Sequence, residues 1–244
     1  MWLMRLDNSW IKVLSYPKGD IIRSLRIWDA LLSYGIRELI NYGQVRIGNV
    51  NVLGKGHSSI VILARHESLG LVVVKIRRTD SKTPTLLHEC NLMRKSYPIA
   101  PKIFYCSDDV IVREYVKGEC LSDVVDKIKS CKEAVALILK VLGATYWLDL
   151  NNVDHKELSI PSKHILISKE GSVKIIDFES GRMRSACNVC RVVSWLIIRR
   201  DLLRKYCRVK DRKFLERAIK LLRDYKYNKE NFKKLLSFII KCSR

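Results

Sequence analysis

The sequence predicts an α+β protein with two lobes, the first rich in antiparallel β-structure and the second helical. Three apolar runs separated by glycine-containing turns predict a meandering sheet, at residues 45–53, 60–66 and 71–76. A long helix is predicted further on, at residues 132–150, from apolar side chains at helical spacing: Ala134, Leu137, Ile138, Val141, Leu142, Thr145 and Leu148.

A short helical leader precedes the strands. Residues 20–33 have an apolar stripe formed by Ile21, Leu25, Trp28 and Leu32. Asp20 is available as the N-cap and Gly35 as the stop signal. The leader is too short for a sizeable core of its own, so we expect it to pack on the lobe that comes after it. The predicted parts are a leader at residues 1–44, an N-terminal lobe at 45–117 and a helical lobe at 118–244.

The composition predicts a folded, soluble, cytoplasmic protein. With 48% hydrophobic and 29% charged residues, the 244-residue chain can bury a sizeable core. Residues 1–7 lack the order of a signal peptide, and no apolar run approaches the roughly 20 residues that cross a bilayer. We expect the eight cysteines to be reduced thiols. Cys187 and Cys190 lack the second pair that a zinc site needs, so we expect buried helix positions.

The net charge of +21 is concentrated near the end of the chain. Residues 182–244 contain 20 Lys and Arg against 5 Asp and Glu. Heat-adapted proteins also carry charged helices, but there Lys and Arg interleave with Glu, which is scarce here. We therefore favour a polyanionic partner, such as RNA or an acidic protein surface. Two amphipathic helices are expected at residues 212–224 and 231–240, with apolar faces formed by Phe214, Ile219, Leu222, Phe232, Leu235, Leu236 and Ile239.

A glycine-containing turn follows the first predicted strand. Gly54 and Gly56 allow a ligand to approach the backbone closely, so that amide groups can cover the phosphates of a nucleotide. The predicted phosphate-binding residues are Gly54, Lys55, Gly56, Ser58 and Ser59. Taken by itself, this pattern is more often a plain hairpin turn than a phosphate-binding loop.

Lys75 ends an apolar strand and needs an acidic partner if it is buried. Glu89 lies in a helical stretch at residues 85–94, and Asp80 is the only other acid between Lys75 and Asp108. We therefore predict a Lys75–Glu89 pair. The alternative is a strand-end lysine whose ammonium group reaches water.

In their order and spacing, these features and two later motifs resemble atypical protein kinases of the RIO type, including the small kinase of the KEOPS tRNA-modification complex. The later motifs occupy residues 154–158 (Asp-His-Lys-Glu-Leu) and 176–179 (Ile-Asp-Phe-Glu). The resemblance covers residues 45–200 and is strongest to predicted archaeal serine/threonine kinases of that group. It implies a two-lobed protein-kinase-like fold that binds ATP with Mg²⁺, or with Mn²⁺.

The resemblance also implies roles for single residues. Lys75, fixed by Glu89, would hold the α and β phosphates. The backbone groups of Glu114 and Val116, in a strand and its connector, would read the adenine edge. Asp177 would hold the metal ion. Helix-forming sequence follows Asp177 closely, without the long activation segment of a signalling kinase.

The catalytic loop departs from the family pattern His-x-Asp-Leu-x-x-x-Asn. Alignment on His155 makes Glu157 the catalytic base and places His164, two residues late, at the metal-binding position. An imidazole ligand suits Mn²⁺ or Zn²⁺ better than Mg²⁺. Alignment on the apolar pair after His164 would put Ser159 at the base position. We prefer the first alignment because it preserves the order of histidine, acid and leucine.

Other roles remain open for this loop. Glu157 could be a capping or ion-pairing residue, His164 a structural histidine, and Lys163 a point charge that neutralises phosphate. Phosphoryl transfer to serine or threonine of a protein is the leading function, with an ATPase switch on an RNA–protein assembly using the same residues. The alternative is an inactive nucleotide-binding scaffold that binds RNA or a protein. A small-molecule kinase of the aminoglycoside or choline type is disfavoured, because the basic last third would repel a cationic acceptor.

Overall fold

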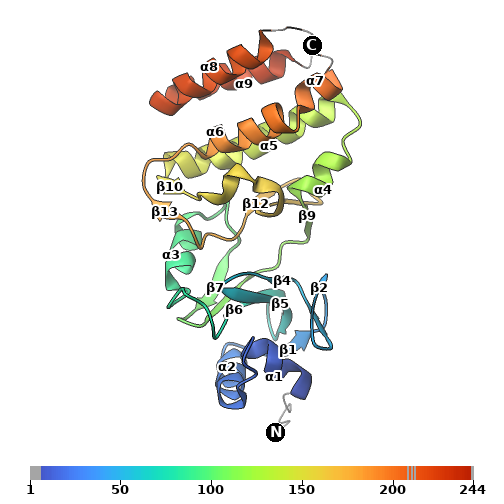
Figure 1. The fold of residues 1–244 in the computed structure, drawn as a ribbon, viewed down its shortest axis with the longest axis vertical. Coiled ribbons are helices and arrows are strands. Elements are labelled where there is room, and N and C mark those ends of the chain that lie inside the picture. The colour runs from blue at the N-terminus through green and yellow to red at the C-terminus, as the bar shows by residue number, and fades with distance from the viewer. Residues whose placement is uncertain (1–6, 208, 210, 212, 243–244) are drawn as a thin grey trace. The chain divides into compact units, whose positions relative to one another are not determined.

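The computed structural model describes residues 7–207, 209, 211 and 213–242 (Figure 1). The chain forms two compact units. Unit 1 comprises Met1–Arg94 and Pro101–Tyr115, and unit 2 comprises Lys95–Ala100 and Val116–Arg244. Antiparallel strands dominate unit 1 and helices dominate unit 2. The predicted α+β class is therefore confirmed, and the architecture is consistent with a protein-kinase-like fold.

Unit 1 is built on an antiparallel sheet with the strand order β1-β5-β6-β8-β7, and β4 pairs with β5. A separate two-stranded hairpin consists of β2 and β3. The elements of unit 1 are α1 (Asn8–Leu14), α2 (Ile21–Ser33), β1 (Ile36–Ile40), β2 (Val45–Ile47), β3 (Val50–Val52), β4 (Gly54–Lys55), β5 (Ser59–His66), β6 (Gly70–Arg77), α3 (Leu87–Lys95), β7 (Ile103–Cys106) and β8 (Val110–Glu114).

The helical leader belongs to the core of unit 1. The predicted helix is confirmed as α2, and the Asp20 side chain accepts a hydrogen bond from the Arg23 amide as its N-cap. Its buried face differs from the predicted stripe and consists of Ser24, Ile27, Trp28 and Leu31. Ile21 and Leu25 are instead 58% and 46% exposed. Ser24 can be buried because its hydroxyl donates to backbone carbonyls.

Two predictions for residues 45–55 are wrong. The apolar run at residues 45–53 is a hairpin rather than one strand, because Gly48 adopts a positive φ of 58° and the chain reverses there. The sequence did contain a signal for this reversal, because Gly48-Asn49 is a pair typical of two-residue hairpin turns. Gly54 and Lys55 lie in strand β4 rather than in a turn.

Unit 2 surrounds one long central helix, α5, and also contains a three-stranded sheet with the order β12-β11-β9. Its elements are β9 (Gly118–Cys120), α4 (Leu121–Asp126), α5 (Cys131–Leu150), β10 (Val153–Asp154), the 3₁₀ turns η1 (Glu157–Ser159) and η2 (Pro161–Lys163), β11 (Ile165–Ser168), β12 (Val173–Ile175), β13 (Arg182–Met183), α6 (Asn188–Val193), the π-helical turn η3 (Ser194–Arg199), α7 (Leu202–Cys207), α8 (Phe214–Tyr227), the 3₁₀ turn η4 (Lys229–Asn231) and α9 (Phe232–Lys241).

The helix predictions for unit 2 are largely confirmed. All seven predicted core positions of α5 are buried. Helices α8 and α9 pair with each other, and α9 also packs on α5 (Figure 1). Of their predicted apolar faces, only Ile219 is exposed and Leu236 is half-buried. The predicted start of the first of these helices, Arg212, lies outside the described residues, as do residues 1–6 of the predicted leader.

The prediction of reduced cysteines is wrong for six of the eight. Disulfides join Cys90 to Cys106, Cys131 to Cys207 and Cys187 to Cys190, while Cys120 and Cys242 are free. Folding brings together the first two pairs, which are 16 and 76 residues apart, so spacing could not indicate them. Cys190 lies within α6 as expected and Cys187 is the N-cap residue of this helix, but both are half-buried rather than buried.

No helix in the described part of the chain is both long enough and apolar enough to span a bilayer.

A pair of glycine substitutions tests the packing of unit 2. In Gly118→Ala the new Cβ would lie 2.4 Å from the Ile167 carbonyl oxygen in the neighbouring strand. We expect a loss of about 1–3 kcal/mol in the free energy of unfolding, because the two backbones must separate. Gly143→Ala within α5 meets no atom within 4 Å and should instead stabilise by about 0.5–1 kcal/mol. Urea unfolding of both variants measures this contrast, and equal effects would contradict it.

Candidate functional site

The glycine motif forms the end of a hairpin in unit 1. Gly54 and Lys55 pair with β5, and the Gly56 amide donates to the Ser59 carbonyl oxygen at 2.9 Å. Arg78 stabilises the loop with two hydrogen bonds. Its guanidinium donates to the Gly56 carbonyl and its amide donates to the Ser58 carbonyl. The loop is therefore held in one shape by the protein itself.

The two glycines of this loop are not required by the packing of the chain. A Cβ at Gly54 would come no closer than 3.8 Å to Val61, and one at Gly56 no closer than 3.6 Å to the Ser59 carbonyl oxygen. Neither glycine has a positive φ. The fold could therefore accommodate side chains at both positions, yet the sequence has glycine. Their absence fits close approach of a ligand, such as a phosphate group, to the backbone.

Lys75 and Glu89 meet inside unit 1. The Lys75 ammonium lies 2.7 and 2.6 Å from the two Glu89 carboxylate oxygens, and the residues are only 6% and 3% exposed. Lys75 is on β6 and Glu89 is in the first turn of α3. Two charges can be buried here because each compensates the other. The alternative of a lysine reaching water is therefore ruled out for this conformation.

The two residues predicted to contact adenine fall in different units. Glu114 ends β8 in unit 1, where its amide donates to the Lys102 carbonyl and its carboxylate accepts from the Lys102 amide. Val116 is buried at the start of the second segment of unit 2. Their contact with a nucleotide stays a prediction.

Unit 2 brings together three predicted site residues. Glu157 lies on η1, His164 follows η2, and Asp177 follows β12. His164 Nε2 is 3.3 Å from a Glu157 carboxylate oxygen, and His164 Nδ1 is 3.9 Å from a carboxylate oxygen of Asp177. One donor atom from each of the three lies within 4.8 Å of the others.

This cluster fits a divalent cation. Two carboxylates and one imidazole match the preferences of Mn²⁺ or Zn²⁺ more closely than those of Mg²⁺, which favours oxygen ligands. The side chains are partly open to solvent, at 34% for Glu157, 21% for His164 and 41% for Asp177. Ser159 and Lys163 are exposed and do not belong to the cluster.

The backbone is strained on both sides of the cluster. Lys156 and Asp177 adopt positive φ angles of 63° and 69°. A non-glycine residue in this region costs about 1–3 kcal/mol and persists only where the surrounding structure fixes it. Such strain is concentrated at functional sites, which supports a role for the loop around Glu157 and for Asp177.

His155 connects the loop to the strand that precedes Asp177. Its ring is fully buried, packs edge-on against Phe178 with centroids 4.6 Å apart, and its Nε2 donates to the Ile176 carbonyl at 3.0 Å. Nδ1 is buried with no hydrogen-bond partner among the described residues. Burial lowers the pKa of His155 to about 4, so the ring is neutral at pH 7. The sequence showed His155 as an alignment anchor and missed this structural role.

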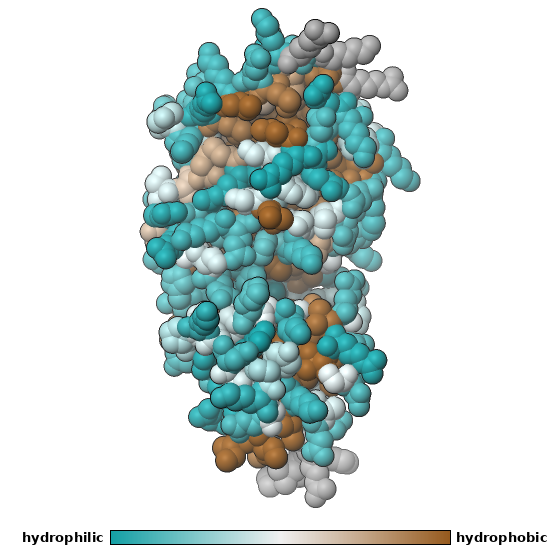
Figure 2. Space-filling view, viewed as in Figure 1, coloured by the Kyte–Doolittle hydropathy of each residue, from teal (hydrophilic) through white to brown (hydrophobic). Residues whose placement is uncertain are grey.

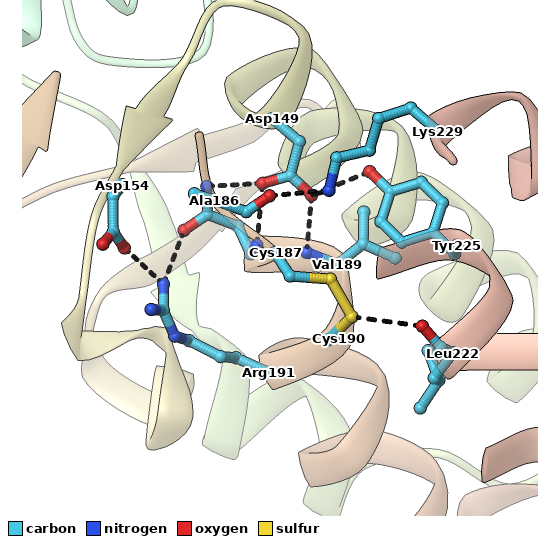
Figure 3. The surroundings of a disulfide bond; sticks show 11 residues. Asp149, Asp154, Ala186, Cys187, Val189, Cys190, Arg191, Leu222, Tyr225 and Lys229 are labelled. Atoms are coloured by element: carbon cyan, nitrogen blue, oxygen red, sulfur yellow. Dashed lines mark hydrogen bonds and ion pairs between the residues drawn. A yellow bond between two sulfur atoms is a disulfide. The ribbon is translucent and has the colours of Figure 1, made fainter. Parts of the chain in front are cut away.

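A second group, missed in the sequence, fixes the start of the same loop. The Asn188 side chain accepts a hydrogen bond from the His155 amide and donates to the Val153 carbonyl and to Asp149. The buried Asp149 carboxylate also accepts from the Tyr225 hydroxyl at 2.7 Å (Figure 3). Burial raises the pKa values of Asp149 and Tyr225. The sequence signal for this group was Asp149 itself, an acid on the apolar face of the helix predicted at residues 132–150.

The comparisons with known proteins point to protein kinases. No family model matches the chain. Serine/threonine-protein kinase shk2 of Schizosaccharomyces pombe is 31% identical over 143 residues, which cover 52% of this chain and 24% of shk2. Serine/threonine-protein kinase PAK mbt of Drosophila melanogaster is 29% identical over 143 residues, covering 54% and 22%. Mitogen-activated protein kinase kinase SIPKK of Nicotiana tabacum is 30% identical over 141 residues, covering 53% and 39%.

The similarity spans about half of this chain but only 22% to 39% of those three relatives. Together with the architecture of the two units, it supports a protein-kinase-like domain.

Removal of one partner tests the buried ion pair. Glu89→Ala leaves the Lys75 ammonium buried without its carboxylate, and we expect a loss of about 3–5 kcal/mol in the free energy of unfolding. The matched control is Glu119→Ala, which breaks the exposed Lys127–Glu119 pair and should cost at most about 1 kcal/mol. Urea unfolding measures both, and a Glu89→Ala effect no larger than the control would show that the pair is not buried.

The pH dependence of stability tests His155. Its pKa is about 6.5 in an unfolded chain and about 4 in the folded one, so between these values the unfolded state alone takes up a proton. Stability present above pH 6.5 is therefore lost as the pH falls, by about 3 kcal/mol in total.

The matched variant is His155→Gln, whose amide can still donate to the Ile176 carbonyl but does not titrate. Urea unfolding at pH 7.5 and pH 4, in a chelating buffer, should show a larger loss for the unmodified protein than for this variant. The same loss in both would mean that His155 is not the group responsible.

Proposed function

We propose that this protein transfers the γ-phosphoryl group of ATP to serine or threonine of a protein, as an atypical kinase of the RIO type. The observation that carries the proposal is the buried Lys75–Glu89 pair. Protein kinases use such a pair to position the nucleotide phosphates. The similarity to serine/threonine kinases over half of the chain supports the same function.

Unit 1 would bind the phosphates. The bare backbone of the loop at Gly54 and Gly56 offers amide donors, and Arg78 keeps the loop in shape. Lys75 would contribute its charge to the α and β phosphates while Glu89 holds it in place. Glu114 and Val116 would offer backbone groups to the adenine.

Unit 2 would hold the metal ion and handle the proton. Asp177 and His164 would bind Mg²⁺ or Mn²⁺, and a bound ion would neutralise the phosphate charge. Glu157 would accept the proton of the attacking hydroxyl. One Glu157 oxygen accepts a hydrogen bond from Ser180, which orients the carboxylate.

The atypical assignment is supported by the short connection after Asp177. Helix α6 begins at Asn188, only 11 residues after Asp177. The short strand β13 between them pairs with β10, so this stretch does not form a long activation segment. Glu179 follows Phe178 at the position where kinases have a glycine, which restricts the backbone there. Both features favour a fixed loop over one that is switched by phosphorylation.

An RNA–protein assembly is the partner that we propose for the basic helices. Arg217, Lys220, Arg223 and Lys226 are exposed on α8, and Tyr227 beside them is 91% exposed. Cations bind phosphates and an exposed ring can stack on a base. Figure 2 shows hydrophilic side chains over much of this helical region, with apolar ones among them.

Turnover of ATP by the purified protein tests the function. Transfer of the γ-phosphate to a pool of serine- and threonine-containing peptides, and its release as phosphate, would be measured with Mg²⁺ or Mn²⁺. We expect Asp177→Ala and Glu157→Gln each to lower kcat by at least roughly 100-fold. Glu170→Gln, which changes an exposed carboxylate, should have no effect.

The outcomes separate the candidate functions. ATP binding without any turnover would identify an inactive nucleotide-binding scaffold. Phosphate release that RNA stimulates, without peptide phosphorylation, would favour an ATPase switch. Full activity in Glu157→Gln would exclude Glu157 as the base.

A further inference from the structure

The Cys187–Cys190 disulfide lies beside the functional loop of unit 2. Figure 3 shows it at the start of α6, close to α8, where Cys190 Sγ is 3.6 Å from the Leu222 carbonyl oxygen. Both cysteines are half-buried rather than enclosed in the core. The proposed kinase function makes no use of this bond.

This disulfide closes the shortest loop of the three. Its cysteines are 3 residues apart, against 16 for Cys90–Cys106 and 76 for Cys131–Cys207. A cross-link stabilises a protein mainly by restricting the unfolded chain, and this effect grows with loop length. The Cys187–Cys190 bond therefore contributes least to stability, so the protein should stay folded when this bond alone is opened.

The structure can also accommodate the dithiol form of this pair. Once reduced, the Cys190 thiol can donate a hydrogen bond to the Leu222 carbonyl oxygen that it already faces. Lys229 donates to the carbonyl of Ala186, directly before Cys187, and this bond does not depend on the disulfide. Reduction thus leaves the start of α6 attached to α8 through Cys190 and to the turn η4 through Lys229.

The short loop encloses the residue that holds the catalytic loop. Asn188 is fully buried between the two cysteines, and its side chain accepts from the His155 amide at 3.3 Å. His155 in turn donates to the Ile176 carbonyl, next to Asp177. A continuous path of covalent and hydrogen bonds therefore leads from the disulfide to the proposed metal ligand.

We propose that Cys187 and Cys190 are a redox-active pair whose disulfide form holds Asn188 against the loop at His155, and whose dithiol form loosens that hold. The co-reactant is a dithiol, either a small molecule or a protein. Its thiolate attacks one sulfur of the pair, which forms a mixed disulfide and releases the other cysteine as a thiolate. Its second thiol then displaces the remaining cysteine, so the protein gains two electrons and two protons and the co-reactant leaves as a disulfide.

The first test follows the three disulfides in the full chain. The protein would be equilibrated with dithiothreitol at graded ratios of reduced to oxidised form, alkylated, and analysed by peptide mass. If Cys187–Cys190 is a redox-active pair, it must open at ratios at which Cys90–Cys106 and Cys131–Cys207 stay closed. Opening of Cys187–Cys190 together with or after the other pairs would overturn the proposal.

The second test follows the loop itself and does not depend on kinase activity. When only Cys187–Cys190 is reduced, amide hydrogen exchange in residues 153–158 should accelerate by roughly 2- to 30-fold. Cys187→Ser/Cys190→Ser should exchange fast under all conditions, whereas Cys120→Ser, which removes a free thiol, should respond like the unmodified protein. Unchanged exchange after reduction of the unmodified protein would refute the coupling, whether or not the double variant folds.

The effect on activity rests on the proposed function. Phosphoryl transfer should be slower in the dithiol form than in the disulfide form, and a rise on reduction would contradict the assigned direction. If no turnover is found in either state but exchange responds to reduction, the kinase proposal fails while the redox proposal stands.

Discussion

The buried carboxylate of Asp149 is the interaction on which the functional part of unit 2 depends. It accepts hydrogen bonds from the Asn188 amide and side chain, from the Val189 amide and from the Tyr225 hydroxyl. One side chain of α5 thereby fixes the start of α6 and a residue of α8. Burial raises its pKa, while these donors and Lys229 at 4.0 Å favour the charged form. Loss of the carboxylate would leave several buried donors unpaired.

The same principle operates in unit 1, where Lys75 and Glu89 form a charged pair inside an apolar sheet and helix. In each unit, burying a charged group costs free energy of desolvation. Hydrogen-bonding or oppositely charged partners offset this cost only when they are correctly placed around the group. Apolar packing could tolerate small shifts of these elements, but the paired groups cannot. Residues proposed for phosphate binding and metal binding are therefore attached to the most strictly positioned parts of their units.

Much of the fold could be predicted because it depends on local patterns. The apolar spacing in α5 and the capped start of α2 identified those helices almost to the residue. The sequence also identified Glu89 as the partner of Lys75, since few acids were available. The buried face of α2 was misjudged because the rotation of an amphipathic helix is decided by what it packs against. The hairpin at Gly48 was missed because the turn pair Gly48-Asn49 was taken as part of a single strand.

By itself, the sequence determined the class of fold and the chemistry of the proposed site: a glycine loop, a lysine with one suitable acid, and an acid and a histidine near Asp177. These depend on residue type, order and spacing, which a chain carries before it folds. Only the tertiary structure decided that Asn188 and Asp149 hold the loop at His155, and which cysteines pair. Except for Cys187–Cys190, those contacts join residues 16 to 76 positions apart, and proximity across such distances arises only from packing.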